Sequence, residues 1–120
     1  MKVEEIQAYN MAMETAEKIW NLIIQWDFFE KETVGKQLMY AVDSIATNLS
    51  NGLGRFYYKE NKRSCYYSQG ALYEARTWLV KAHNRSLIND TDFNNLLADL
   101  DVIANELNNY IKTIGPPKKK

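Results

Sequence analysis

Four cationic and three aromatic side chains are concentrated within nine consecutive positions near the middle of the chain. The cations are Arg55, Lys59, Lys62 and Arg63, and Phe56–Tyr58 lies between the first two. Cations attract phosphate and aromatic rings stack on unpaired bases, so this combination is typical of proteins that bind single-stranded nucleic acid. Tyrosine and arginine also favour protein–protein interfaces. A third interpretation is that the rings close the end of the fold, for which Phe56, without a polar tip, is best suited.

Three glycines surround this cluster in segments that otherwise have a helical pattern. They are Gly52, Gly54 and Gly70. A glycine inside a helix costs roughly 1 kcal/mol relative to alanine, so each of them requires a structural reason. We predict that Gly52 permits close approach of another helix. Asn48, on or beside the same apolar stripe, is expected to hydrogen-bond to backbone across a helix junction.

One helical face after the cluster combines cations with aromatic residues. At 100° per residue, this face contains Lys59, Lys62, Arg63, Tyr66, Gly70, Tyr73 and Lys81. Gly70 leaves a hollow between the rings of Tyr66 and Tyr73 that a partner helix could enter. We therefore predict that part of this face contacts a subunit or a partner protein.

Catalytic constellations are missing from the sequence. His83 is the only histidine and is expected at a helix boundary, and Cys65 is the only cysteine and is expected as a small buried thiol. No glutamate lies three residues before His83, so the Glu-x-x-His pair of bundle metal sites is absent. Gly52 and Gly54 lack the third glycine of a dinucleotide-binding motif. We predict a protein that is not an enzyme and that has no cofactor and no metal.

The charges sum to zero but are unevenly distributed. Residues 55–85 carry seven basic and two acidic side chains, whereas residues 1–32 carry seven acids against three bases, and residues 86–114 carry five acids against one base. A basic middle region is compatible with an anionic partner. The chain has no apolar run near the roughly 20 residues of a membrane span, its first ten residues are unlike a signal peptide, and it has one cysteine, so we expect a cytoplasmic protein.

Apolar residues recur at helical spacing, and we predict an all-α fold. The predicted helices span about 3–26, 34–53, 59–84 and 91–114, with Asp90 or Thr91 capping the last one. Matched lengths and short connections predict an up-down-up-down antiparallel four-helix bundle over residues 1–115, followed by a disordered basic tail at 116–120. Three tryptophans and eight tyrosines exceed what one small bundle buries, so we also predict an oligomer.

A family resemblance rests on the glycine-containing segments. Residues 48–55 read Asn-Leu-Ser-Asn-Gly-Leu-Gly-Arg, and residues 70–74 read Gly-Ala-Leu-Tyr-Glu. This arrangement resembles the signature of the 23S rRNA intervening-sequence proteins, a bacterial four-helix-bundle family that typically has an N-I-A-E-G-x-G-R run and a later G-S-x-x-E motif. The resemblance extends from about Glu14 to Ile114. The chain is also similar to the accessory variability determinants of diversity-generating retroelements, which share the fold.

The resemblance implies a homopentameric barrel of four-helix bundles. In the accessory proteins, that barrel binds nucleic acid and a partner reverse transcriptase through a basic surface. The family's second helix typically carries Q-x-R-R-A, whereas this chain has Met39 and Tyr40 where the two arginines would stand; Asn51 and Ala71 replace the acid and the serine of the two motifs.

The sequence thus predicts a self-assembling, non-enzymatic protein that binds RNA or DNA. The candidate nucleic-acid-binding residues are Arg55, Lys59, Lys62, Arg63 and Lys81. The residues predicted to serve helix packing or a subunit interface are Asn48, Gly52, Gly54, Tyr66, Gly70, Tyr73 and Glu74. The alternative is a protein-interaction adaptor or scaffold without nucleic-acid binding, and the salt dependence of binding would separate the two.

Overall fold

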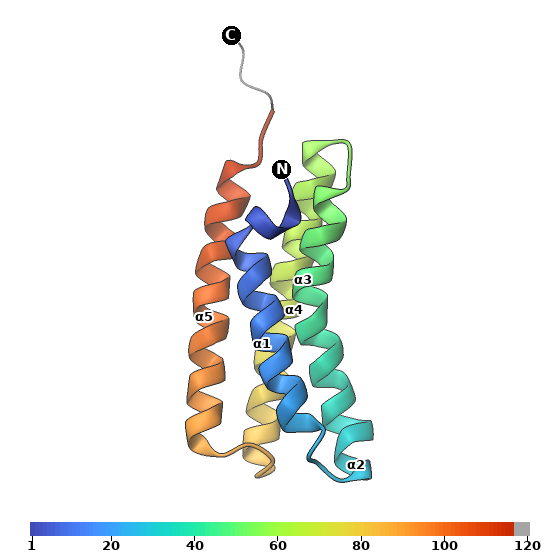
Figure 1. Ribbon diagram of the computed structural model, residues 1–120, viewed down its shortest axis with the longest axis vertical. Helices are drawn as coiled ribbons and strands as arrows, with labels where there is room; N and C mark the ends of the chain where they lie inside the picture. The colour runs from blue at the N-terminus through green and yellow to red at the C-terminus, as the bar shows by residue number, and fades with distance from the viewer. Residues whose placement is uncertain (117–120) are drawn as a thin grey trace.

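Four long helices form the protein in a computed structural model that describes residues 1–116. The helices are α1 (Gln7–Ile23), α3 (Lys36–Leu53), α4 (Tyr58–Asn84) and α5 (Asp90–Thr113). They pack side by side as a bundle in which α3 contacts α1 and α4, and α5 contacts the same two helices (Figure 1). The α3–α4 pairing is the most extensive. The described residues contain no β-strand, and none of their helices is long and apolar enough to cross a membrane.

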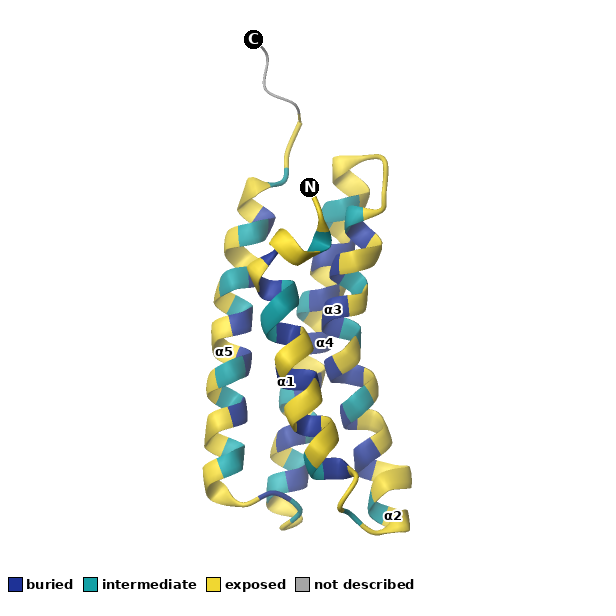
Figure 2. Cartoon of the chain, viewed as in Figure 1, coloured by how far each residue is buried: buried dark blue, intermediate teal, exposed yellow. Residues whose placement is uncertain are grey.

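The inner faces of the four helices are buried (Figure 2), and their apolar residues form a large cluster and a smaller one that includes Leu49 and Leu107. The largest fully buried side chains are Ile19, Leu38, Ile45, Leu49, Leu72, Leu79, Leu100, Ile103 and Leu107. Within residues 1–116, every buried side-chain nitrogen or oxygen has a hydrogen-bond partner. The helical spacing of apolar residues therefore positions the core as expected. Of the predicted tail, Pro116 is exposed, and residues 117–120 lie outside the described part of the chain.

The first helix is shorter than the predicted span of 3–26. A single 3₁₀ turn, η1 (Val3–Glu5), comes first, and Ile6 is extended (φ −87°, ψ 110°) before α1 begins. The Ile6 side chain is buried with Leu49 and Leu107. The extended residue directs the chain into the end of the core, and that burial explains why the helix does not continue back to residue 3.

The predicted connection over residues 27–33 is largely helical. Asp27 precedes the short helix α2 (Phe28–Glu30), and a π-helical segment, η2 (Lys31–Gly35), continues directly into α3. Asp27 Oδ1 accepts from the Glu30 backbone N–H at 2.8 Å, and Glu30 Oε1 accepts from the Asp27 N–H at 3.2 Å. This reciprocal capping box starts the helix, and the Asp-x-x-Glu spacing in the sequence is its recognisable signal.

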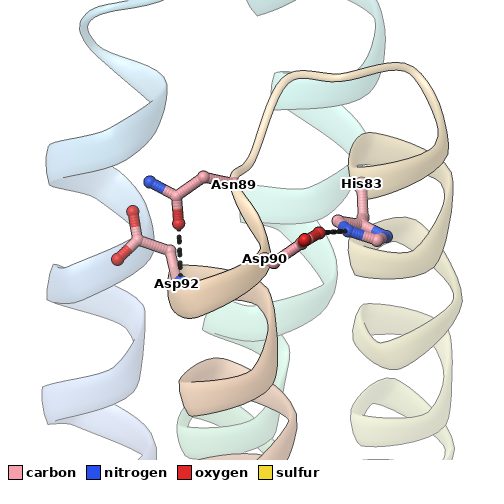
Figure 3. Close-up of polar contacts among 4 residues, drawn as sticks. All are labelled: His83, Asn89, Asp90 and Asp92. Atoms are coloured by element: carbon pink, nitrogen blue, oxygen red, sulfur yellow. Dashed lines mark hydrogen bonds and ion pairs between the residues drawn. The ribbon is translucent and has the colours of Figure 1, made fainter.

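The last helix is capped by Asn89, and the prediction of Asp90 or Thr91 as the cap was wrong. Asn89 Oδ1 accepts from the backbone N–H of Asp92 at 2.7 Å (Figure 3). Asp90 instead places Oδ1 2.6 Å from Nε2 of His83 and so links the start of α5 to the end of α4.

Candidate nucleic-acid interface

Small residues form the contact between α3 and α4 that positions the predicted site. A Cβ added to Gly52 would lie 2.7 Å from the Ser64 Cβ and 2.7 Å from Asn61 Oδ1, distances too short for any side chain. Farther along α4, Ser68 Oγ donates a 2.7 Å hydrogen bond to the carbonyl oxygen of Ile45. We call this contact the α3–α4 seam. It allows α3 and α4 to approach each other closely near the turn that joins them.

The polar bond across the seam comes from Ser68, and the expectation for Asn48 was wrong. Asn48 Nδ2 donates to the carbonyl oxygen of Ser44, four residues earlier in its own helix, at 2.9 Å. Sequence reasoning missed Ser68 because a serine among apolar positions gives only a weak signal. Its spacing of four residues from Ser64, which is also buried, is the pattern that could have identified it.

A turn over residues 54–57 brings Arg55 to the edge of the seam. The backbone N–H of Gly54 donates to Ser50 O at 3.3 Å, and that of Arg55 donates to Gly52 O at 3.0 Å. Gly54 has φ −75°, which any residue adopts, and its added Cβ would make only ordinary contacts. Of Gly52 and Gly54, only Gly52 is therefore required by the packing.

The four clustered cations separate into two groups. Arg55 and Arg63 line a hollow of about 210 Å³ between the end of α3 and the first turns of α4, which we call the notch. Its remaining lining residues are Asn51, Glu60, Ser64 and Tyr67. Lys59 and Lys62 are not part of this lining. None of these four cations forms an ion pair with another residue of the described chain, so their charges remain available.

Lys62 lies on the side of α4 that faces α5. It precedes Gln69 and Arg76 by seven and fourteen residues, which places all three on one side of the helix. Gln69 donates to Asn108 and Arg76 pairs with Asp101, both on α5. The cluster therefore extends over two sides of α4, with the notch on the α3 side.

The three aromatic rings beside the cations do not close the end of the bundle. Phe56 is 91% exposed and Tyr57 is 63% exposed, and their rings meet edge to face at a centroid separation of 4.9 Å. The interpretation of Phe56 as a plug is contradicted for this chain. The turn between α3 and α4 lies at the same end of the molecule as the N-terminus (Figure 1).

Gly70 faces solvent and has no packing role within the chain. No atom lies within 4 Å of a Cβ added there, and the flanking Tyr66 and Tyr73 rings are exposed. Glu74, one turn further along α4, is exposed too and forms no ion pair with another described residue. The face thus keeps a shallow gap between two tyrosines.

Lys81 is separated from the other candidate cations. It follows Arg63 by 18 residues on the same helix, about 27 Å at 1.5 Å per residue. Its Nζ lies 5.3 Å from the centroid of the Trp78 ring, a cation–π contact near the opposite end of α4. The structure does not bring Lys81 together with the notch.

The cysteine and the histidine occupy structural positions. Cys65 is fully buried, and burial raises the pKa of its thiol to about 11, so the reactive thiolate is scarce at neutral pH. The His83 ring stacks on Phe93 at 4.0 Å while it contacts Asp90. Among residues 1–116, no three histidine, cysteine or acidic side chains are grouped so that they could hold a metal ion.

Comparisons with known proteins support the family resemblance. The family model of the 23S rRNA-intervening sequence proteins matches residues 4–109. A crystal structure of a protein of unknown function, from the S23 ribosomal protein family of Bacteroides thetaiotaomicron, shares the fold with a TM-score of 0.78 and 20% sequence identity. The similarity covers 93% of this chain and 99% of that one. No curated protein matches the chain. The match over most of the sequence shows that this chain belongs to the 23S rRNA-intervening sequence protein family.

Proposed function

We propose that this protein is a non-enzymatic, cytoplasmic accessory factor that self-assembles and binds RNA or DNA. In this proposal each chain is an up-down-up-down antiparallel four-helix bundle. The observation that carries it is the group of cations at the α3–α4 end, Arg55, Lys59, Lys62 and Arg63, which have no acidic partner among the described residues. The exposed rings of Phe56 and Tyr57 next to them supply flat surfaces for unpaired bases.

Assembly strengthens binding by such a small patch. When four cations of one chain bind a nucleic acid, they release few counterions from its phosphates. A single patch therefore binds weakly and loses affinity quickly as salt rises. Several linked copies bind one strand with much greater avidity than any single copy does. We therefore propose a homo-oligomer, and a pentamer on the basis of the family resemblance, in which each chain repeats the basic end.

Two measurements test this proposal. Light scattering should give a mass near 70 kDa, five times the 14.0 kDa chain, whereas a monomer at micromolar concentration would contradict assembly. Fluorescence anisotropy with single-stranded RNA at low salt should give micromolar binding that falls steeply with added salt. Replacing Lys59, Lys62 and Arg63 by glutamine should reduce the slope of log K against log salt by about 2, at roughly 0.7 per phosphate contact on a single strand.

The second candidate is an adaptor that binds another protein through α4. The exposed gap at Gly70 between Tyr66 and Tyr73 favours it, because tyrosine is enriched at protein interfaces. The triple glutamine variant distinguishes the two functions, since an aromatic contact should depend little on salt or on those cations. RNA binding that is absent in dilute buffer, or unchanged in the variant, would favour the adaptor.

A further inference from the structure

The notch between α3 and α4 is a hollow lined by residues of both helices and of the turn between them. Ser64, which is 5% exposed, is the buried residue of its lining, and Gly52 next to it permits the close approach of the two helices. Arg55 from the turn and Arg63 from α4 line the same hollow. Both arginines therefore line the same small space.

Two arginines in a confined space are suited to phosphate. A guanidinium presents a planar fork of N–H donors that matches phosphate oxygens, and lysine lacks this geometry. The volume of about 210 Å³ is below the roughly 300–1,000 Å³ of pockets for drug-sized ligands. The notch therefore has room for one phosphate group and the edge of one base.

Two further lining residues restrict the ligand beyond a bare anion. The Glu60 carboxylate accepts hydrogen bonds only, so it disfavours free phosphate and favours a ligand that also presents N–H donors. Tyr67, which is 61% exposed, also lines the hollow and has an aromatic ring on which a base can stack. A nucleotide with an exocyclic amino group satisfies all three requirements, because it has a phosphate, a flat base and a donor edge.

We propose that the notch is a nucleotide-binding subsite of a single RNA strand. Arg55 and Arg63 bind one backbone phosphate, Tyr67 stacks on an adjacent base, and Glu60 accepts from the exocyclic amine of that base. The subsite consequently prefers cytidine, adenosine or guanosine to uridine. This inference rests on the proposed nucleic-acid binding and adds a position and a base preference to it.

The test compares ten-nucleotide oligocytidine and oligouridine by anisotropy at low salt. The parent should bind oligocytidine about fivefold more tightly than oligouridine, a modest part of the discrimination available to a base-edge contact. Glu60→Gln should bind both strands at least as tightly but reduce the preference below twofold. Arg63→Lys, which keeps the charge and loses the fork, should weaken oligocytidine binding about tenfold. The matched control, Arg85→Lys at the opposite end of α4, should change binding less than twofold.

A second measurement separates failure of the subsite from failure of the function. In an NMR titration, cytidine 5′-monophosphate should shift the Asn51 side-chain amide signal in the parent but not in Arg63→Lys, and uridine 5′-monophosphate should shift it less. If oligocytidine and oligouridine bind equally and Arg63→Lys binds like the parent, the subsite is overturned while nucleic-acid binding stands. If the mononucleotide shifts Asn51 but no RNA binds, the subsite stands and the proposed function fails. If neither ligand has any effect, both are overturned.

Discussion

Gly52 and Gly70 are glycines in neighbouring helices with opposite surroundings. At Gly52, an added Cβ would lie 2.7 Å from Ser64 Cβ, so the α3–α4 seam has no space for a side chain. At Gly70, nothing in the chain lies within 4 Å. Both glycines reduce the intrinsic stability of their helices by a similar amount. Packing within the chain therefore explains the glycine at position 52 only. The glycine at position 70 is explained either by contact with a partner or by chance.

The largest expected effect tests the difference between the inner and outer faces of α4. Leu72→Ala should lower the free energy of unfolding by about 2–5 kcal/mol, because a side chain that is 1% exposed is replaced by a cavity. Tyr73→Ala, its neighbour on the outer face, is the matched control and should cost well under 1 kcal/mol in the monomeric chain. Urea denaturation measures both. Equal losses would show that the outer face is packed in solution.

Gly52→Ala should have the next largest effect. The added methyl group overlaps the Ser64 Cβ, and overpacking of this kind typically costs about 1–3 kcal/mol despite the better helix propensity of alanine. Chemical denaturation of the single variant and of Gly52→Ala with Ser64→Gly measures this loss. The double variant should recover part of the stability, because position 64 then has no Cβ to overlap the added methyl group. If the double variant recovers no stability, the overlap with the Ser64 Cβ is not the source of the loss.

Gly70→Ala should change the free energy of unfolding in the opposite direction from Gly52→Ala, and by a smaller amount. Without a neighbour to clash with, alanine should stabilise the isolated helix by about 0.5–1 kcal/mol. If the gap receives a partner helix, however, Gly70→Leu should lower the assembled mass in light scattering while leaving helix content unchanged by circular dichroism. A leucine variant with the parent's mass would show that the gap is empty in the assembly.

Cys65, in the core cluster with Leu49 and Leu107, should make stability depend on pH only in the alkaline range. Burial raises the pKa of the thiol from 9.0 to about 11, so the folded state disfavours the thiolate. The contribution of this residue to stability should be constant below pH 9 and should be lost as the pH rises toward 11. A Cys65→Ala variant should lack this decline. Rapid alkylation of the native thiol at pH 7.5 would contradict its burial.

The sequence was informative about the fold because apolar spacing reports which helix faces are buried. The four long helices and the core leucines follow from that spacing alone. The helical character of residues 28–33 was missed because exposed Phe28 and Phe29 interrupt the stripe, and because the Asp27–Glu30 capping box was not recognised. Helix ends depend on single polar bonds, and apolar periodicity does not report these.

The candidate site was predictable only as a list of residue types. Arg55 and Arg63 were identified, but their shared notch with Asn51 and Tyr67 depends on how closely α3 and α4 approach. Lys81 was grouped with them because helical projection ignores distance along the axis, and it lies about 27 Å farther along α4. The exposure of Phe56 could not be read from its apolar character, because the packing of neighbouring helices decides burial.

The four-residue turn between α3 and α4 has a consequence for how the molecule folds. Residues 36–84 form two packed helices joined by this turn, and their contacts nearest the turn are close in sequence. Such local contacts form quickly because little chain entropy is lost in closing the loop. Every residue that lines the notch lies between positions 51 and 67, close to the turn. We therefore expect the surface that recognises a ligand to mature early in folding, before α5 docks and completes the core.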